Sequence, residues 1–395
     1  MLTPSVRLLG ARRSLLALAT ALDRSRWRPV VLAKEEGVMT EKLRAAGIAT
    51  RIIHFRPWRK GKFLVFRPFT IWKLRRIARD EQAALLHCNE IYPNPYAVRA
   101  AAPLGIPVVT HMRLSVTPRQ TRNYLLDRAN RIVVVSNAAG DCFNHWPDKA
   151  RKVTTVYNGL DLDEFAPRPG ARAQWRRRVG VAEDEVLFGM LGLISARKQQ
   201  HVAIEALSQA RREGAPARLL IMGEVSPRED GYNRMIRALV DQLDLGERVR
   251  FEPFQTDPVP AFQALDVNLL ISNDEGFGRV IIEAGALGTP SIGARTGGIP
   301  ELIEDGQDGL LVEAGDARAL AAAMKFLCDA PLRARLGAAA RDKVRARFSI
   351  QTHARRMEAL YDEVVAAAGR SLGPNAGFVS GNHRTVPATA AMPGE

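Results

Sequence analysis

The chain has 395 residues, 46% hydrophobic and 25% charged, which is enough for two domains that each bury a core. No window approaches the roughly 20 consecutive apolar residues that a membrane-spanning helix needs. The three cysteines, Cys88, Cys142 and Cys328, are far apart and lack metal-ligand spacing, which predicts a reduced cytoplasmic setting and no metal site.

The net charge of +15 lies entirely in the first part of the chain. Residues 1–165 hold 28 Lys and Arg against 13 Asp and Glu, whereas the remaining residues hold 29 of each kind. This asymmetry predicts a polyanionic partner, either nucleic acid or an anionic membrane face, that only the first domain contacts.

From the N-terminus, the first half of the chain alternates short apolar strands with helical segments. We expect strands at 29–33, 48–55, 84–87, 106–111 and 131–135. Such alternation predicts a parallel sheet with helices on both faces. Only Met1 to Ser5 precede the first turn, so either the first strand is short or the start of the chain is truncated.

Arg12 and Arg13 precede a short apolar run that contains an Ala-x-Ala pattern, as in an export signal. The alternative, which we favour, is an amphipathic helix that opens the first domain.

The stretch from Arg51 to Arg79 contains ten basic residues and no acidic one. Six aromatics are interleaved with them: Phe55, Trp58, Phe63, Phe66, Phe69 and Trp72. Because basic residues near an anionic leaflet contribute about 1 kcal/mol each and buried aromatics add to this, we predict a membrane-surface patch. Aromatics between cations also suit single-stranded nucleic acid, but no nucleic-acid-binding motif is present. A third interpretation is a loop whose aromatics fill the core of the first domain.

Pro167, Pro169 and Gly170 break regular structure and mark a domain boundary. Beyond them we expect strands at 186–193, 218–222, 249–252, 267–272 and 290–293, and helices at 201–212, 233–243, 318–328 and 332–347. Two doubly wound domains that face each other form a cleft, with ligands at the carboxyl ends of the strands. A last helix is expected at 351–368, and the residues after about 371 have the composition of a disordered tail.

Two carboxylates lie beside glycine turns after the strand expected at 267–272. Glu275 precedes the helix expected from Arg279, and Glu283 lies in its second turn, while a second glycine turn follows at Gly297 and Gly298. This combination suits a sugar nucleotide, because hydroxyls need acceptors and phosphates need unhindered backbone N–H groups.

Arg197 and Lys198 lie in a turn between a strand and the helix expected from His201. Two cations beside the positive end of a helix dipole predict an anion site. The alternative is a solvated basic turn.

Four pieces of this sequence, in order, resemble the donor-binding signature of the retaining family-4 glycosyltransferases (glycosyl transferases group 1). They are E-G-F-G-x-x-x-x-E-A at Glu275–Ala284, G-x-P at Gly288–Pro290, G-G-I-P-E at Gly297–Glu301, and D-G-x-x-G-L-L-V at Asp305–Val312. Two further segments, Gly10–Ala19 and Asn158–Phe165, resemble the first helix and the hinge of that family.

The resemblance implies an α/β protein with the GT-B fold, in which two Rossmann-like, doubly wound domains face each other across a cleft. It implies an acceptor-side domain at 1–166, a donor-binding domain at 172–348, a helix at 349–369 that crosses back to the first domain, and a tail at 370–395.

The resemblance also implies roles in donor binding. Lys198 grips the diphosphate, with Arg197 as a possible substitute for a family arginine that is Leu193 here. Glu283 binds the ribose hydroxyls, and Glu275 lies against the transferred sugar as a catalytic residue. The donor-binding turns comprise Gly276, Phe277, Gly278, Gly297 and Gly298.

In the first domain, His111 matches the family histidine that contacts the donor sugar and is the second catalytic candidate. A satisfied structural histidine is the alternative. Asn89 and Glu90 are candidates for the acceptor side, and Ser136 is either a cleft residue or a helix N-cap.

The resemblance implies metal-independent transfer of a sugar from a nucleoside-diphosphate donor. The stretch from Arg51 to Arg79 alone motivates the further hypothesis that the acceptor is a membrane-associated or lipid-linked glycan, in cell-surface polysaccharide or glycolipid synthesis. We expect a cytoplasmic enzyme that is peripheral on the inner face of the membrane and binds no nucleic acid. The alternatives are a relative that binds glycan or lipid without transfer, and a soluble sugar synthase or epimerase of the same architecture.

Overall fold

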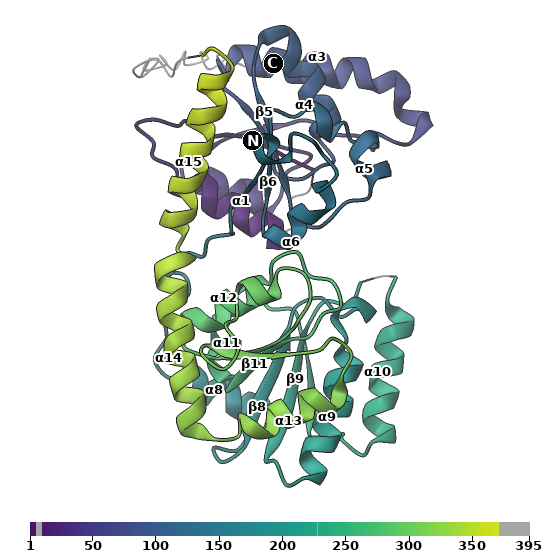
Figure 1. Cartoon of the computed structure of the whole chain (residues 1–395), viewed down its shortest axis with the longest axis vertical. Helices are drawn as coiled ribbons and strands as arrows, with labels where there is room; N and C mark the ends of the chain where they lie inside the picture. Colours follow the sequence, from purple (N-terminus) through teal and green to yellow (C-terminus); the bar gives the residue numbers. More distant parts are fainter. Residues whose placement is uncertain (5–9, 227, 371–395) are drawn as a thin grey trace, which may run out of the picture.

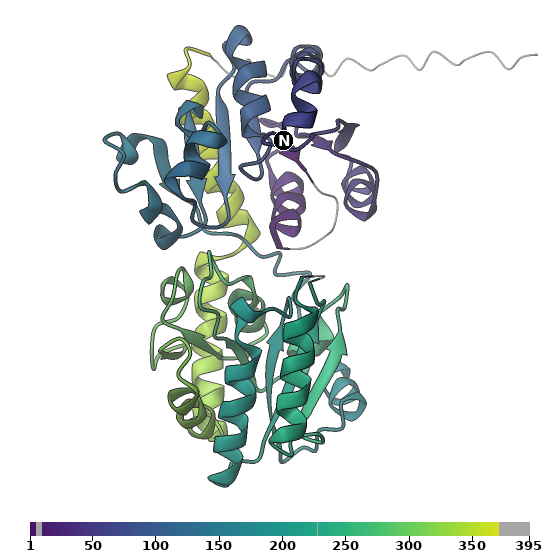
Figure 2. The ribbon, with the colours of Figure 1, turned by 90° about the vertical axis from the view of Figure 1, so that its right-hand side faces the viewer.

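The computed structural model describes residues 1–4, 10–226 and 228–370, so most of the tail expected at 370–395 lies outside the described residues. Each half of the chain forms a parallel sheet flanked by helices, and the two halves lie one above the other in Figures 1 and 2. The predicted two-domain α/β architecture is therefore confirmed.

The first sheet has seven strands in the order β3-β2-β1-β4-β5-β6-β7, all paired in parallel. The central strands are buried along their whole length, as expected for a sheet covered on both faces. The first strand is short, with two residues. The strands are β1 Leu2–Thr3, β2 Val30–Ala33, β3 Ala49–Ile52, β4 Leu86–Cys88, β5 Val108–Met112, β6 Arg131–Val134 and β7 Val153–Thr155.

The helix expected in place of an export signal is present as α1, which buries Ser14, Leu15, Leu18 and Ala19 against the first domain. The other helices here are short except α3. The helices are α1 Gly10–Ala21, α2 Val38–Ala45, α3 Arg67–Asp80, α4 Asn94–Ala101, α5 Pro118–Asn123, α6 Asn137–Gly140 and α7 Lys149–Lys152, with 3-10 turns η1 Gly61–Phe66, η2 Ala102–Leu104, η3 Leu126–Arg128 and η4 Asp141–Phe143.

The second sheet has six parallel strands in the order β10-β9-β8-β11-β12-β13. Its strands are β8 Val186–Leu191, β9 Ala217–Gly223, β10 Val249–Pro253, β11 Val267–Leu270, β12 Ser291–Ala294 and β13 Gly309–Val312. Its helices are α8 Ala171–Arg178, α9 Gln200–Arg212, α10 Asp230–Gln242, α11 Val259–Ala264, α12 Arg279–Ala286, α13 Ala317–Phe326 and α14 Ala330–Arg347, with 3-10 turns η5 Ala196–Lys198 and η6 Ile299–Glu301.

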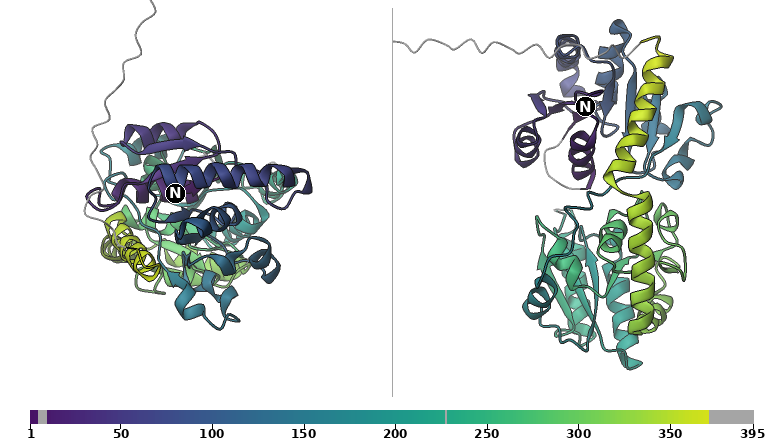
Figure 3. Two further views of the ribbon diagram at one scale, coloured as in Figure 1. Left: turned by 90° about the horizontal axis from the view of Figure 1, so that it is seen from above. Right: turned by 90° about the vertical axis from the view of Figure 1, so that its left-hand side faces the viewer.

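The last helix, α15 (Ile350–Ala367), returns to the first domain, as predicted. Figures 1 and 3 show α14 along the second domain and α15 along the first. Met357, Tyr361 and Val364 of α15 pack with Trp27 and Val133 in one buried cluster. The chain therefore crosses between the domains twice.

The two crossings are joined by backbone hydrogen bonds. The N–H of Leu160 donates to Phe348 O at 2.8 Å, and the N–H of Ile350 donates to Leu160 O at 2.8 Å. Gly159 lies so close to α15 that a Cβ there would overlap His353. The helix breaks at this point, and the hydroxyl of Ser349 caps α15 by accepting from Thr352 N.

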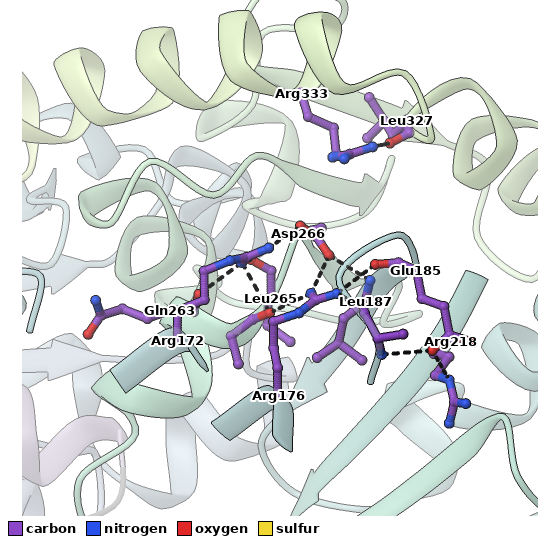
Figure 4. A network of polar contacts seen from close by, with 12 residues as sticks. Arg172, Arg176, Glu185, Leu187, Arg218, Gln263, Leu265, Asp266, Leu327 and Arg333 are labelled. Carbon is purple, nitrogen blue, oxygen red and sulfur yellow. Dashed lines mark hydrogen bonds and ion pairs between the residues drawn. The ribbon is translucent and has the colours of Figure 1, made fainter. Parts of the chain in front are cut away.

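A buried ion cluster joins α8 to the amino ends of β8 and β11 (Figure 4). The carboxylate of Asp266 lies 2.8 Å from Arg176, 2.6 Å from Arg172, and 2.8 Å from the backbone N–H of Leu187. Because these strand ends point away from the first domain, the cluster serves the structure of the second domain.

Candidate active site

Lys198 and Glu275 meet at the carboxyl ends of β8 and β11. Lys198 Nζ lies 2.5 Å from Glu275 Oε2, and Arg197 Nη1 lies 3.7 Å from the same oxygen. The guanidinium of Arg197 also donates to Asp274 O, and Asn273 N donates to Arg197 O at 3.1 Å. Since β8 and β11 are neighbours in the sheet, the two loops form one cationic and acidic surface, as the sequence predicts.

Gln199 follows Lys198 in a left-handed conformation, with φ 56. The family pattern that this turn resembles in the sequence has glycine at this position, and glycine adopts the conformation without cost. The backbone turn is therefore kept although the glycine is not, and α9 begins at the next residue.

The glycine turns contact each other and the first domain. A Cβ on Gly276 would overlap Arg113 O, and one on Gly297 would overlap Glu275 O. Gly298 N donates to Glu275 O at 2.9 Å. These glycines thus hold the Glu275 loop against its neighbours, and the expected direct role in donor binding stays a prediction for Gly276, Gly278, Gly297 and Gly298.

Phe277 does not face the cleft. Its side chain is buried and lies 6.1 Å, between ring centroids, from both Tyr157 and Phe348 at the domain crossings. The turn directs this side chain into the core, and the expected part of Phe277 in the donor-binding turn stays a prediction.

Glu283 lies in the second turn of α12, as expected, and is almost fully buried. Its carboxylate lies 3.2 Å from Arg279, one turn earlier. Arg279 also donates to Ser14 Oγ of α1 at 2.8 Å, so this pair spans the two domains.

Further contacts join the domains beside the Glu275 loop. Ser136 Oγ donates to Gly276 O at 2.6 Å and accepts from Ala139 N, so both expected roles of this serine are present together. Glu301 accepts from Asn137 N and Ala138 N, both at 2.9 Å, which places its carboxylate at the start of α6.

His111 has no exposed surface in this structure. Its ring is stacked between His87, with centroids 5.6 Å apart, and His353, with centroids 6.3 Å apart. Burial, with Arg113 nearby, lowers the pKa of His111 well below its ordinary value. β5 directs this ring into the interior, which agrees with the alternative of a structural histidine, and the expected contact of His111 with the donor sugar stays a prediction.

Arg113 directly follows β5 at its cleft end and is a site residue that the sequence motifs did not indicate. Its guanidinium donates to Asn89 Oδ1 at 2.7 Å and to Asn158 Oδ1. Glu90, beside Asn89, pairs with Arg12 at 3.0 Å. Arg113 is the first residue after β5, as Asn89 is the first residue after the neighbouring strand β4, and this shared position could have suggested Arg113.

The described residues contain no group of three or more His, Cys, Asp and Glu placed to hold a metal ion, and metal independence stays a prediction. No helix among them is long and apolar enough to cross a membrane.

A cavity of about 1450 Å³ lies at the opposite end of the first sheet, lined by residues such as Trp27, Val30 and Leu86, and does not belong to this site.

Two family models match the chain. The model of the Glycosyltransferase Family 4 matches residues 9–164, and the model of the Glycosyl transferases group 1 matches residues 171–343. Among curated proteins, the D-inositol 3-phosphate glycosyltransferase of Saccharomonospora viridis is 34% identical over 250 residues, which is 60% of this chain and 57% of that protein. The one from Thermobifida fusca is 30% identical over 223 residues, 54% of this chain and 51% of that protein. The chain thus spans little more than half the length of these relatives.

Solved structures share the fold. HepE of Anabaena, in complex with UDP and glucose, superposes with a TM-score of 0.80 at 24% identity, covering 92% of this chain and 98% of that chain. Sucrose-phosphate synthase from Thermosynechococcus elongatus has a TM-score of 0.74 at 24% identity, covering 91% and 94%.

Proposed function

Because the chain belongs to the family-4, group 1 glycosyltransferases, we propose that it transfers a sugar from a nucleoside-diphosphate donor to a glycan or lipid-linked acceptor, with retention of anomeric configuration. The observation that carries the proposal is the pairing of Lys198 with Glu275 at the carboxyl ends of adjacent parallel strands. This edge of a doubly wound sheet is where such folds bind ligands.

In the proposed reaction, the bond between the anomeric carbon and the diphosphate oxygen breaks, and its electron pair stays with the diphosphate. Lys198, with Arg197, stabilises the charge that develops there. Glu275 stabilises the positive charge that develops on the sugar. The acceptor oxygen bonds to the anomeric carbon on the same face, and its proton passes to the departing diphosphate. No metal is needed in this scheme.

Glu283 is proposed to accept hydrogen bonds from the ribose hydroxyls. It must exchange its contact with Arg279 for those hydroxyls, or accept both, since a carboxylate has about four lone-pair sites. HepE of Anabaena has been solved in complex with UDP and with UDP-glucose, and these are the first ligands to test.

The proposed membrane-associated acceptor is supported by a surface on η1 and α3. Five large hydrophobic side chains are exposed within nine residues, here called the α3 patch: Leu64 51%, Val65 78%, Phe66 41%, Phe69 62% and Trp72 51%. Phe69 and Trp72 stack with centroids 6.0 Å apart, and Arg56 lies over Phe66. Contiguous exposed apolar surface among cations is typical of membrane contact.

Two aromatics of the stretch from Arg51 to Arg79, Phe55 and Trp58, have a structural role. Phe55 is buried and Trp58 packs on Tyr96, so these two aromatics belong to the core of the first domain. The α3 patch itself lies on the side of the first domain away from the second domain (Figure 1), and we propose that it docks on the inner face of the cytoplasmic membrane.

The function is tested by screening UDP-, GDP- and ADP-sugars for thermal stabilisation, followed by product analysis with the best donor. We expect one nucleotide to stabilise the wild type and Lys198→Ala to abolish that effect. Arg212→Gln, at the distal end of α9, is the control.

Three results would contradict the proposal or part of it. Stabilisation without hydrolysis or transfer would indicate a protein that only binds. Transfer to free sugars alone would indicate a soluble synthase, and conversion of the donor sugar without transfer would indicate an epimerase.

A further inference from the structure

Three arginines from three elements converge on the first turns of α1. Arg12 lies on α1 itself and pairs with Glu90 at 3.0 Å. Arg113, at the end of β5, is linked to α1 through Asn89, which accepts from Arg113 at 2.7 Å and donates to Ala11 O at 3.1 Å. Arg279, from the second domain, donates to Ser14 Oγ at 2.8 Å.

The carboxylates around these arginines do not balance their charge. Glu90 pairs with Arg12 and Glu283 pairs with Arg279, whereas Arg113 is held by two neutral amides. Residues 1–22 contain no acidic side chain, so the α1 region supplies no further anion. The cluster therefore carries one positive charge in excess, beside the positive end of the α1 dipole.

The electrostatics of Arg113 agree with this count. Burial, and then the nearby charges of Arg279 and Arg12, lower its pKa to about 9, although Glu90 acts in the opposite direction. The Nε atoms of Arg12 and Arg113 are buried and have no hydrogen-bond partner among the described residues. An anion bound by these guanidinium groups would offset the excess charge.

We propose that Arg12, Arg113 and Arg279 form a second anion subsite, distinct from Lys198, that binds a phosphate or carboxylate group of the acceptor. The inference rests on the proposed function, because it names the chemistry of that acceptor. Two of the three arginines belong to the first domain, whereas Lys198 and Arg197 lie in the second domain against Glu275. Planar guanidinium groups suit oxyanions because they donate two parallel hydrogen bonds.

The experiment measures inorganic phosphate binding by calorimetry in two backgrounds that remove the donor diphosphate site: protein saturated with UDP, and the Lys198→Ala variant. We expect phosphate to bind in both, and Arg113→Gln to weaken it at least tenfold in both. Arg113→Lys should restore part of the affinity, and the distant Arg212→Gln should leave it unchanged. Because Arg113 is partly buried, Arg12→Gln serves as a second variant with the same expected direction.

Two outcomes would overturn the inference. One is that phosphate binds in neither background. The other is that Arg113→Gln and Arg12→Gln weaken UDP binding as much as phosphate binding, which would assign the cluster to the donor diphosphate. The proposed function and the inference fail separately. If the wild-type protein bound no nucleoside diphosphate, the proposed function would be refuted, and phosphate binding to the Lys198→Ala variant would still test the arginine cluster.

Discussion

Lys198 Nζ lies 2.5 Å from Glu275 Oε2, so the cation proposed for the donor diphosphate and the carboxylate proposed for the sugar neutralise each other in this structure. A diphosphate must compete with Glu275 for Lys198. The same contact keeps both side chains in one place, at the join of two loops.

Replacing Glu275 is therefore expected to separate binding from turnover. In Glu275→Gln, UDP affinity should rise by about fivefold, because a partly buried ion pair worth roughly 1 kcal/mol no longer opposes binding. Transfer should fall by about 100-fold or more, because the developing sugar cation loses its counter-charge. Calorimetry with UDP and initial rates with the best donor check this. Equal loss of binding and turnover would contradict it, and Lys198→Ala should lose both.

Gln199 offers a stability test of the turn after Lys198. A left-handed residue other than glycine costs about 1–2 kcal/mol, and glycine loses about 0.5–1 kcal/mol through chain entropy. We expect Gln199→Gly to stabilise the chain by up to about 1 kcal/mol. In contrast, Gln209→Gly inside α9 should destabilise it by about 1 kcal/mol. Urea unfolding of both variants decides, and a loss of stability in Gln199→Gly would exclude strain at this turn.

The histidines at 87, 111 and 353 predict acid sensitivity. Burial lowers the pKa of His353 to about 4 and that of His87 and His111 well below the ordinary value. Between pH 6.5 and about 4 the unfolded chain binds more protons than the folded chain, so stability falls as pH falls. The slope is up to about 1.4 kcal/mol per pH unit for each histidine.

Urea unfolding between pH 7 and 4.5 measures that slope. His353→Gln should reduce it, because one proton-binding difference is removed, whereas the exposed His54→Gln should not change it. An unchanged slope in His353→Gln would show that the neutral ring of His353 contributes nothing to the acid sensitivity.

The α3 patch predicts salt-sensitive membrane binding. Flotation with anionic vesicles should retain the wild type and lose Phe69→Ser combined with Trp72→Ser, since each aromatic contributes about 1–2 kcal/mol on burial. Phe326→Ser is the matched control, because Phe326 is 59% exposed but lies on the second domain. Wild-type protein that stays wholly in the soluble fraction at low salt would contradict the proposal.

Asp266 should affect stability without affecting the reaction. Asp266→Asn leaves Arg176 buried without its counter-charge, which costs about 3–5 kcal/mol. The cluster lies at the opposite end of the sheet from Lys198. The KM for the donor should therefore change by no more than about twofold, which corresponds to less binding free energy than one weak contact contributes. Denaturation and steady-state kinetics together check this, and a large rise in KM would contradict the assignment.

The sequence was most informative where local chemistry decides position. Strand ends and glycine turns placed Lys198 and Glu275 together, because each lies in a loop just beyond a buried strand at the same edge of one sheet, and they placed Glu283 in the helix that follows. The sequence was less informative where packing between distant segments decides which side chains are buried. The burial of His111 depends on His353, more than 240 residues away along the chain, and Phe277 is buried by residues of both crossings.

The membrane stretch shows the same limit within one segment. Its aromatics look alike in sequence, yet Phe55 contributes to the core and Phe69 to the surface. Phe55, in the loop after β3, packs against Tyr96 of α4, whereas Phe69 lies on the exposed side of α3, and this difference comes from tertiary packing. The place of Arg113 at the domain boundary likewise depends on distant residues, since its partners are Asn89 and Asn158.

The two connections between the domains, which meet at Leu160 and Ser349, determine how the domains can move relative to each other. Two adjacent connections joined by main-chain hydrogen bonds act as a hinge axis. They permit rotation of one domain relative to the other about that axis and resist translation of the domains past each other. Gly159 packs closely against α15, so the two connections cannot shift relative to each other at this point. Opening and closing of the cleft should therefore follow a single angular coordinate, which one pair of distance labels, one on each lobe, is sufficient to follow.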